Sequence, residues 1–139
     1  VPEVKVPFYK APFVAINEAI SISGETARMF LKTLFNVFTK LEVSEQVGGP
    51  VQVAKIGYHF VDVGGTSLLS FIALISLSLA VINILPVPAL DGGRLLFILI
   101  EALRGKPLSP KFESMVHGIG FLFLMLFILI VTFYDIIRI

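Results

Sequence analysis

Residues 67–85 read SLLSFIALISLSLAVINIL, and PVPALDGG follows at once as residues 86–93. No charged side chain lies between Val63 and Leu90. Nineteen helical residues at about 1.5 Å each extend about 28 Å, close to the thickness of the hydrocarbon core of a bilayer. The sequence therefore predicts a transmembrane helix over 67–85. Two prolines in 86–93 each remove a helical hydrogen bond, so we expect the helix to break near the far interface.

A second transmembrane helix is predicted for residues 114–134, which carry no acidic or basic side chain apart from His117. A helical run from Arg94 to about Leu103 lies between the two spans, and glycine and proline in the segment 104–107 end it. Lysine and arginine outnumber acidic residues in this connection. Since positive loops stay in the cytoplasm, we expect residues 94–111 to be cytoplasmic.

An amphipathic helix is predicted to start near Phe13, upstream of the spans. One narrow stripe of it is polar, with members spaced three or four residues apart: Glu18, Ser21, Glu25, Arg28, Lys32, Asn36 and Thr39. The rest of its surface is apolar, which favours a helix in the membrane interface or against other membrane helices. An ordinary soluble amphipathic helix is the alternative.

Gly48, Gly49 and Pro50 follow a polar stretch, and the proline is placed to open a short helix at its first position. We expect that helix to run from Val51 to about Tyr58. A loop would follow over residues 62–67, with Thr66 or Ser67 as the N-cap of the first span.

The composition agrees with a membrane protein. Hydrophobic residues make up 56% of the 139 and charged residues 15%, against about 45–50% and about 25% in typical soluble domains. The net charge of +1 gives no argument for nucleic acid as a partner, and the absence of cysteine excludes disulfides and cysteine-ligated zinc. The predicted fold class is an all-α membrane protein, with an amphipathic interfacial helix and then two transmembrane helices joined through the proline-broken LDGG segment.

Asp91 is the candidate for chemistry. A charge at the bilayer centre costs at least about 2.5–3.5 kcal/mol, and irregular backbone at that depth needs cover from protein or a water cavity. We therefore expect Asp91 to face a polar pocket with a partner, which would be a cation, a proton or a metal. The alternative is a simple turn at the cytoplasmic interface with Asp91 in water, because Pro-x-Pro followed by Asp-Gly is common turn chemistry.

The pattern Asn-x-x-Pro-x-Pro-x-Leu-Asp-Gly-Gly at residues 83–93 is similar to the second signature of the site-2 protease family, the bacterial intramembrane zinc metalloproteases of peptidase family M50. Gly48-Gly49-Pro50-Val51 with Ala54 resembles the element that precedes this helix in bacterial members. The resemblance continues through residues 94–107 into the last span. It covers about residues 45–139 well and the amphipathic helix more loosely.

The resemblance implies a role for each motif residue. Asp91 would be the third ligand of a catalytic Zn²⁺ beside two histidines, in the open site of three protein ligands and a water. Asn83 would be catalytic by hydrogen-bonding the substrate or the developing oxyanion. Pro86 and Pro88 would keep the segment extended for substrate binding, and Gly92 and Gly93, like Gly48, Gly49 and Pro50, would be structural.

The resemblance further implies cleavage of transmembrane segments in regulated intramembrane proteolysis, in the bacterial inner membrane. Substrates would be membrane proteins such as an anti-sigma factor or a signal-peptide remnant, and the lipid bilayer is the other partner.

The first signature of that family, a His-Glu-x-x-His helix, does not occur among these residues. The two histidines are His59, on the outer side, and His117, more typical of helix packing than of a ligand. We therefore expect this chain to be the C-terminal part of the protease, inactive without the missing N-terminal half. Residues 1–12 would be a linker from an upstream PDZ-like domain, 13–62 helices at the interface, and 63–139 the two-span half of the core. Two alternatives stay open: a transporter or channel fragment that binds an ion at the broken helix, and a non-catalytic pseudoprotease module.

Overall fold

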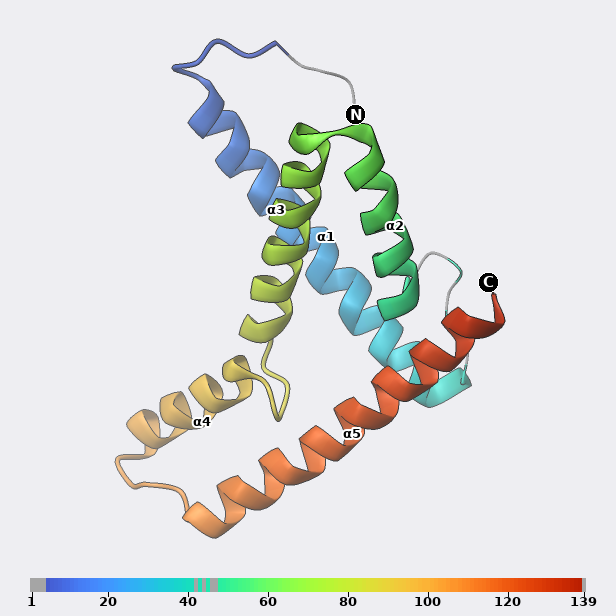
Figure 1. The fold of residues 1–139 in the computed structure, drawn as a ribbon. Coiled ribbons are helices and arrows are strands. Elements are labelled where there is room, and N and C mark those ends of the chain that lie inside the picture. Colours follow the sequence, from blue (N-terminus) through green and yellow to red (C-terminus); the bar gives the residue numbers. More distant parts are fainter. Residues whose placement is uncertain (1–4, 42, 44, 46–47, 139) are drawn as a thin grey trace.

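The computed structural model describes residues 5–41, 43, 45 and 48–138, and this part of the chain is helical without strands. Its elements are α1 (Ala11–Lys40), α2 (Pro50–Val63), α3 (Gly65–Ile84), α4 (Asp91–Arg104) and α5 (Pro110–Ile137). The predicted all-α class with two long apolar helices is confirmed. Figure 1 shows α2 and α3 as a hairpin, with α1 crossing behind α3 and α5 running obliquely below.

Proline sets the start of three helices. Pro12, Pro50 and Pro110 each stand in a first turn, where a missing N–H breaks no helical bond. This is why α1 and α5 begin a few residues earlier than the apolar pattern predicts.

The loop predicted over residues 62–67 is wrong. The helix α2 continues to Val63, the single residue Gly64 reverses the chain, and α3 begins at Gly65 without a side-chain cap from Thr66 or Ser67. Gly64 has a φ of 127°, which is open to glycine and costly for other residues. Gly64 alone therefore replaces the predicted loop, and the chain reverses direction between α2 and α3.

The helices α2 and α3 contact each other near the hairpin tip and enclose a hollow at their other ends. Near the hairpin tip the rings of Phe60 and Phe71 stack at 5.0 Å between centroids. Pro50 and Val53, at the other end of α2, line one hollow with Ser78 and Ile82 of α3. The two helices thus meet at the hairpin tip and diverge toward this hollow at their other ends (Figure 1).

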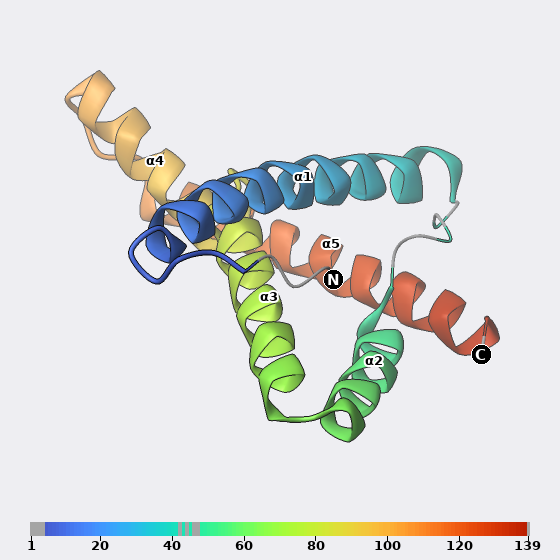
Figure 2. The ribbon, with the colours of Figure 1, turned by 90° about the horizontal axis from the view of Figure 1, so that it is seen from above.

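The most buried contacts join α1 to α5. Val37 of α1 and Val43 pack with Phe127 and Val131 of α5, and Phe38 stacks on Phe123 at 3.5 Å between centroids. In Figure 2 α5 runs obliquely below α1, and in Figure 1 the two helices cross. Thr33 is also buried, and its hydroxyl donates to the carbonyl of Met29 at 2.8 Å, which satisfies its donor within α1.

Two helices, Gly65–Ile84 and Pro110–Ile137, are long and apolar enough to cross a membrane. The most apolar stretch of α3 has no buried residue, and in α5 17% of that stretch is buried. Apolar surface on this scale is unusual for a protein in water and is ordinary against lipid.

Candidate functional site

The break between α3 and α4 is a short, internally bonded turn. Leu85 donates its N–H to the carbonyl of Ile82 at 3.2 Å and ends α3. Leu90 donates to the carbonyl of Val87 at 3.1 Å, so residues 87–90 form a β-turn with Pro88 at its second position. The two prolines therefore end one helix and shape the turn that starts the next.

Ala89 has a φ of 79°, in the left-handed region. This is the third position of the turn, where a type II turn needs positive φ and usually takes glycine. Its N–H donates to Nδ1 of His117 on α5 at 3.1 Å. A residue from the last helix thus bonds the strained point of the turn.

Gly92 and Gly93 are buried in the first turn of α4. A Cβ on Gly92 would overlap the carbonyl oxygens of Ile84 and Leu85, and one on Gly93 would overlap that of Val87. The close backbone approach expected of these glycines is present. It lets the start of α4 lie directly against the end of α3.

Asn83 and Asp91 line the same hollow, of about 370 Å³, together with residues of the first two turns of α4. Asn83 is half-buried in the last turn of α3 and Asp91 is the exposed first residue of α4. A carboxylate at a helix N-terminus is favoured by the helix dipole. The break therefore brings together the two predicted site residues, which are eight positions apart in the sequence.

The carboxylate of Asp91 has no hydrogen bond or ion pair to any residue in the described ranges. It also borders a second hollow, of about 380 Å³, with Arg94, Glu113 and His117. A carboxylate without a protein partner keeps its lone pairs available for a metal ion. The residues present thus fit one oxygen ligand of a zinc site.

The other ligands are not found among the described residues, which contain no group of three His, Cys, Asp or Glu able to hold a metal. His59 is exposed on α2. Nδ1 of His117 is engaged by Ala89, and its Nε2 is buried without a hydrogen-bond partner in the described structure. His117 therefore bonds the turn and belongs to no group of metal ligands among the described residues.

Glu101 has a role that its sequence position did not reveal. Its carboxylate accepts the N–H of Leu108 at 2.9 Å and so closes the turn between α4 and α5.

A carboxylate on α5 caps the helix that Gly48-Gly49-Pro50 opens. Oδ2 of buried Asp135 accepts the N–H of Gln52 at 2.8 Å, and a Cβ on Gly49 would lie 2.9 Å from that oxygen. Sequence reasoning missed Asp135. The signal available was a helix start that has proline but no Ser, Thr, Asp or Asn before it.

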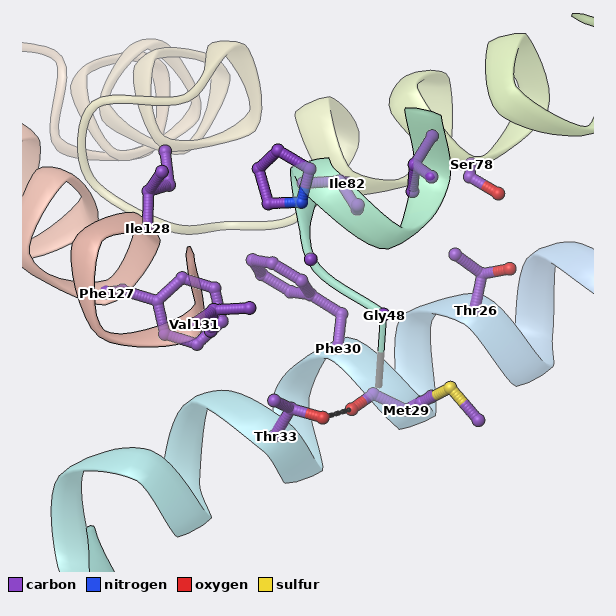
Figure 3. A pocket seen from close by; sticks show the side chains of 13 residues that line it. Thr26, Met29, Phe30, Thr33, Gly48, Ser78, Ile82, Phe127, Ile128 and Val131 are labelled. Atoms are coloured by element: carbon purple, nitrogen blue, oxygen red, sulfur yellow. Dashed lines mark hydrogen bonds between the residues drawn. The ribbon is translucent and has the colours of Figure 1, made fainter. Parts of the chain in front are cut away.

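The glycine segment also borders the mainly apolar hollow of Figure 3, about 450 Å³ in volume, between α1, α2, α3 and α5. Phe30, Phe127 and Val131 project toward it from α1 and α5. Gly48 and Gly49, which the resemblance implies to be structural, thus lie where four helices converge.

Comparison with known proteins decides the family. The model of peptidase family M50 matches residues 8–127. The chain belongs to peptidase family M50. Its M50 relatives include the zinc metalloprotease RasP of Oceanobacillus iheyensis, 41% identical over 82% of this chain and 27% of the relative. A putative zinc metalloprotease of Thermotoga maritima is 37% identical over 96% of this chain and 27% of the relative.

The regulator of sigma-W protease RasP of Bacillus subtilis is 37% identical over 95% of this chain and 31% of the relative. The chain thus spans less than one third of the length of these three M50 relatives. Family membership and the two long apolar helices together make it part of an integral membrane protein. Membership in a peptidase family also counts against the transporter alternative.

Proposed function

We propose that this chain is the C-terminal part of a zinc-dependent intramembrane endopeptidase. The observation that carries the proposal is the shared hollow of Asn83 and Asp91 at the break between two helices. Several relatives are named zinc metalloproteases, which agrees with a metal-binding role for the unpartnered carboxylate.

The zinc site is completed by the other part of the protein in this proposal. Asp91 supplies one oxygen ligand, and a His-Glu-x-x-His helix upstream supplies two nitrogen ligands and the general base. Bound zinc would acidify a water and polarise the scissile carbonyl. On its own, this chain neither holds zinc tightly nor cleaves a peptide bond.

The residues of this chain bind and orient the substrate. Asn83 donates its amide N–H to the substrate backbone or to the oxyanion that develops during attack. The turn containing Pro86 and Pro88 lacks two backbone N–H groups, because proline carries none. Gly92 and Gly93 keep Asp91 close to Asn83, because the first turn of α4 lies directly on the end of α3.

The substrate class we propose is the transmembrane segment of a membrane protein, such as an anti-sigma factor or a signal-peptide remnant. The name of the Bacillus subtilis relative, regulator of sigma-W protease RasP, supports an anti-sigma factor as substrate. The proposed setting is the bacterial inner membrane, with residues 94–111 in the cytoplasm and a PDZ-like domain upstream.

The test uses the full-length protein, meaning this chain with its proposed upstream half, purified in detergent with a transmembrane substrate. Asp91→Ala is expected to lower bound zinc well below one ion per protein and to abolish cleavage. Exposed Asp62→Ala on α2 is the matched control and should retain both. Unchanged zinc content in Asp91→Ala would contradict the ligand role.

The same preparation separates the protease from the pseudoprotease alternative. A protease cleaves the substrate, and cleavage stops when zinc is removed by a chelator and returns when zinc is added. Binding of the substrate helix without cleavage, in protein loaded with zinc, would support the non-catalytic module instead.

A further inference from the structure

We propose that His117 and Gly120 of α5 support the turn of residues 87–90, which precedes Asp91. In this proposal His117 is a positioning residue for the metal site. The inference rests on the proposed function, since it concerns how Asp91 is held. His117 touches neither substrate nor metal in this proposal. It acts on Asp91 through Ala89, two residues earlier in the turn.

The hydrogen bond to Ala89 fixes the state of the imidazole. A backbone N–H can only donate, so Nδ1 of His117 accepts and carries no proton. In a neutral ring the proton is then on Nε2, which is buried. The ring also meets Phe97 of α4 in a T-shaped contact at 5.4 Å between centroids. His117 therefore contacts both the turn and the helix that Asp91 begins.

The hydrogen bond to His117 is made by a residue with a strained backbone conformation. Ala89 is held at a φ of 79°, a conformation that costs an alanine free energy and persists only when its surroundings enforce it. Nδ1 of His117 stabilises this conformation, because it accepts the N–H of Ala89, which has no partner within the turn.

Gly120, three residues after His117, makes room for the turn. A Cβ there would lie 2.7 Å from the carbonyl oxygen of Pro88. At Gly118, two residues earlier, a Cβ would meet nothing within 4 Å. The two α5 residues thus act on adjacent positions of the turn, His117 by a hydrogen bond at Ala89 and Gly120 by shape at Pro88.

The first test measures amide hydrogen exchange of the peptide containing Ala89, by mass spectrometry of the full-length protein in detergent. His117→Leu removes the acceptor and should speed exchange of Ala89 roughly three- to tenfold. His117→Asn keeps an acceptor near the position of Nδ1 and should retain most of the protection. His59→Leu, on exposed α2, is the matched control and should leave exchange unchanged.

The second test measures zinc affinity. His117→Leu should weaken zinc binding by roughly 10- to 100-fold, the usual effect of losing a residue that orients a ligand, and His117→Asn by much less. In the His117→Leu background, Ala89→Gly should restore part of the affinity, since glycine adopts positive φ without help. This rescue distinguishes positioning from a general loss of folding.

Gly120→Ala supplies an independent check, with Gly118→Ala as its control on the same helix. Gly120→Ala should speed exchange at Ala89 and weaken zinc binding. Gly118→Ala should leave both unchanged. Equal protection of Ala89 in His117→Leu and the unsubstituted protein would overturn the inference while leaving the zinc role of Asp91 intact. Full zinc binding in Asp91→Ala would instead refute the proposed function, whatever the exchange at Ala89.

Discussion

Gly92 and Gly93 lie against carbonyl oxygens of α3 and of the turn that follows it, with no room for a methyl group. The adjacent Asp91 therefore owes its position to two neighbours that have no side chains. This explains in physical terms why the carboxylate proposed as a metal ligand is followed by two glycines. The constraint is local backbone packing and does not depend on the metal.

Gly92→Ala is predicted to destabilise the protein by about 1–3 kcal/mol, because the first turn of α4 has to move away from α3. Thermal unfolding in detergent measures the effect. Gly24→Ala on α1 is the control, since a Cβ there meets nothing within 4 Å and alanine favours a helix by up to about 1 kcal/mol. Equal unfolding temperatures for the two variants would show that the overlap at Gly92 is relieved without cost.

Asn83→Ala is predicted to lower kcat by about 10²–10³-fold with zinc content unchanged, because it removes the proposed donor to the developing oxyanion. Steady-state cleavage of a transmembrane substrate and metal analysis of the same sample check this. A rise in KM alone, with kcat preserved, would assign Asn83 to substrate binding only.

At the scale of the helices, α5 supplies polar groups to segments far from it in the sequence. Asp135 caps α2 through Gln52, 83 residues away, and His117 bonds Ala89, 28 residues away. A carboxylate near the end of its own helix is unfavourable there, and at the N-terminus of α2 it is favourable. The position of Asp135 therefore makes sense only when the two helices are considered together.

Asp135→Ala is predicted to cost about 1–2 kcal/mol, because the first turn of α2 loses its cap. Asp135→Asn should cost less, since the amide oxygen still accepts the N–H of Gln52. Urea unfolding of the protein in detergent gives the comparison, with Asp62→Ala as the control. A cost no greater than that of the control would exclude capping as the role of Asp135.

These long-range contacts mark what the sequence could not reveal. The two spans and the helix break could be predicted, because apolar runs and prolines act locally, and the choice of Asn83 as a partner of Asp91 came from the family resemblance. The hydrogen bond of His117 and the cap by Asp135 could not, because no periodic pattern links positions so far apart. The loop at 62–67 was predicted wrongly for a different reason: turn-forming residues were counted, whereas Gly64 alone can reverse the chain.

At the scale of the whole molecule, the arrangement of charge predicts a topology. Arg104, Lys106 and Lys111 lie in or next to the connection between α4 and α5, and Asp62 lies next to the hairpin tip between α2 and α3. Lysine and arginine near a span favour the cytoplasmic side. The tip and the connection lie at opposite ends of the structure in Figure 1.

Because this chain contains no cysteine, single substitutions can report the side of the membrane. Asp62→Cys is predicted to react with a membrane-impermeant maleimide in intact cells, and Lys106→Cys only after the membrane is opened. The unsubstituted protein provides the blank. Labelling of Lys106→Cys in intact cells would reverse the proposed orientation.

The span of α5 has a practical consequence for anyone who engineers this protein. His117 and Asp135 are eighteen residues apart on one helix, about 27 Å along its axis. His117 accepts a hydrogen bond from the turn before α4, and Asp135 accepts one from the first turn of α2. A fluorescent or affinity handle inserted close to Arg138 would displace the last turn of α5, next to Asp135. The displacement would first weaken the cap of α2 by Asp135. It would then reach the turn that precedes Asp91 through the rigid helix, so a long flexible spacer is the safer choice.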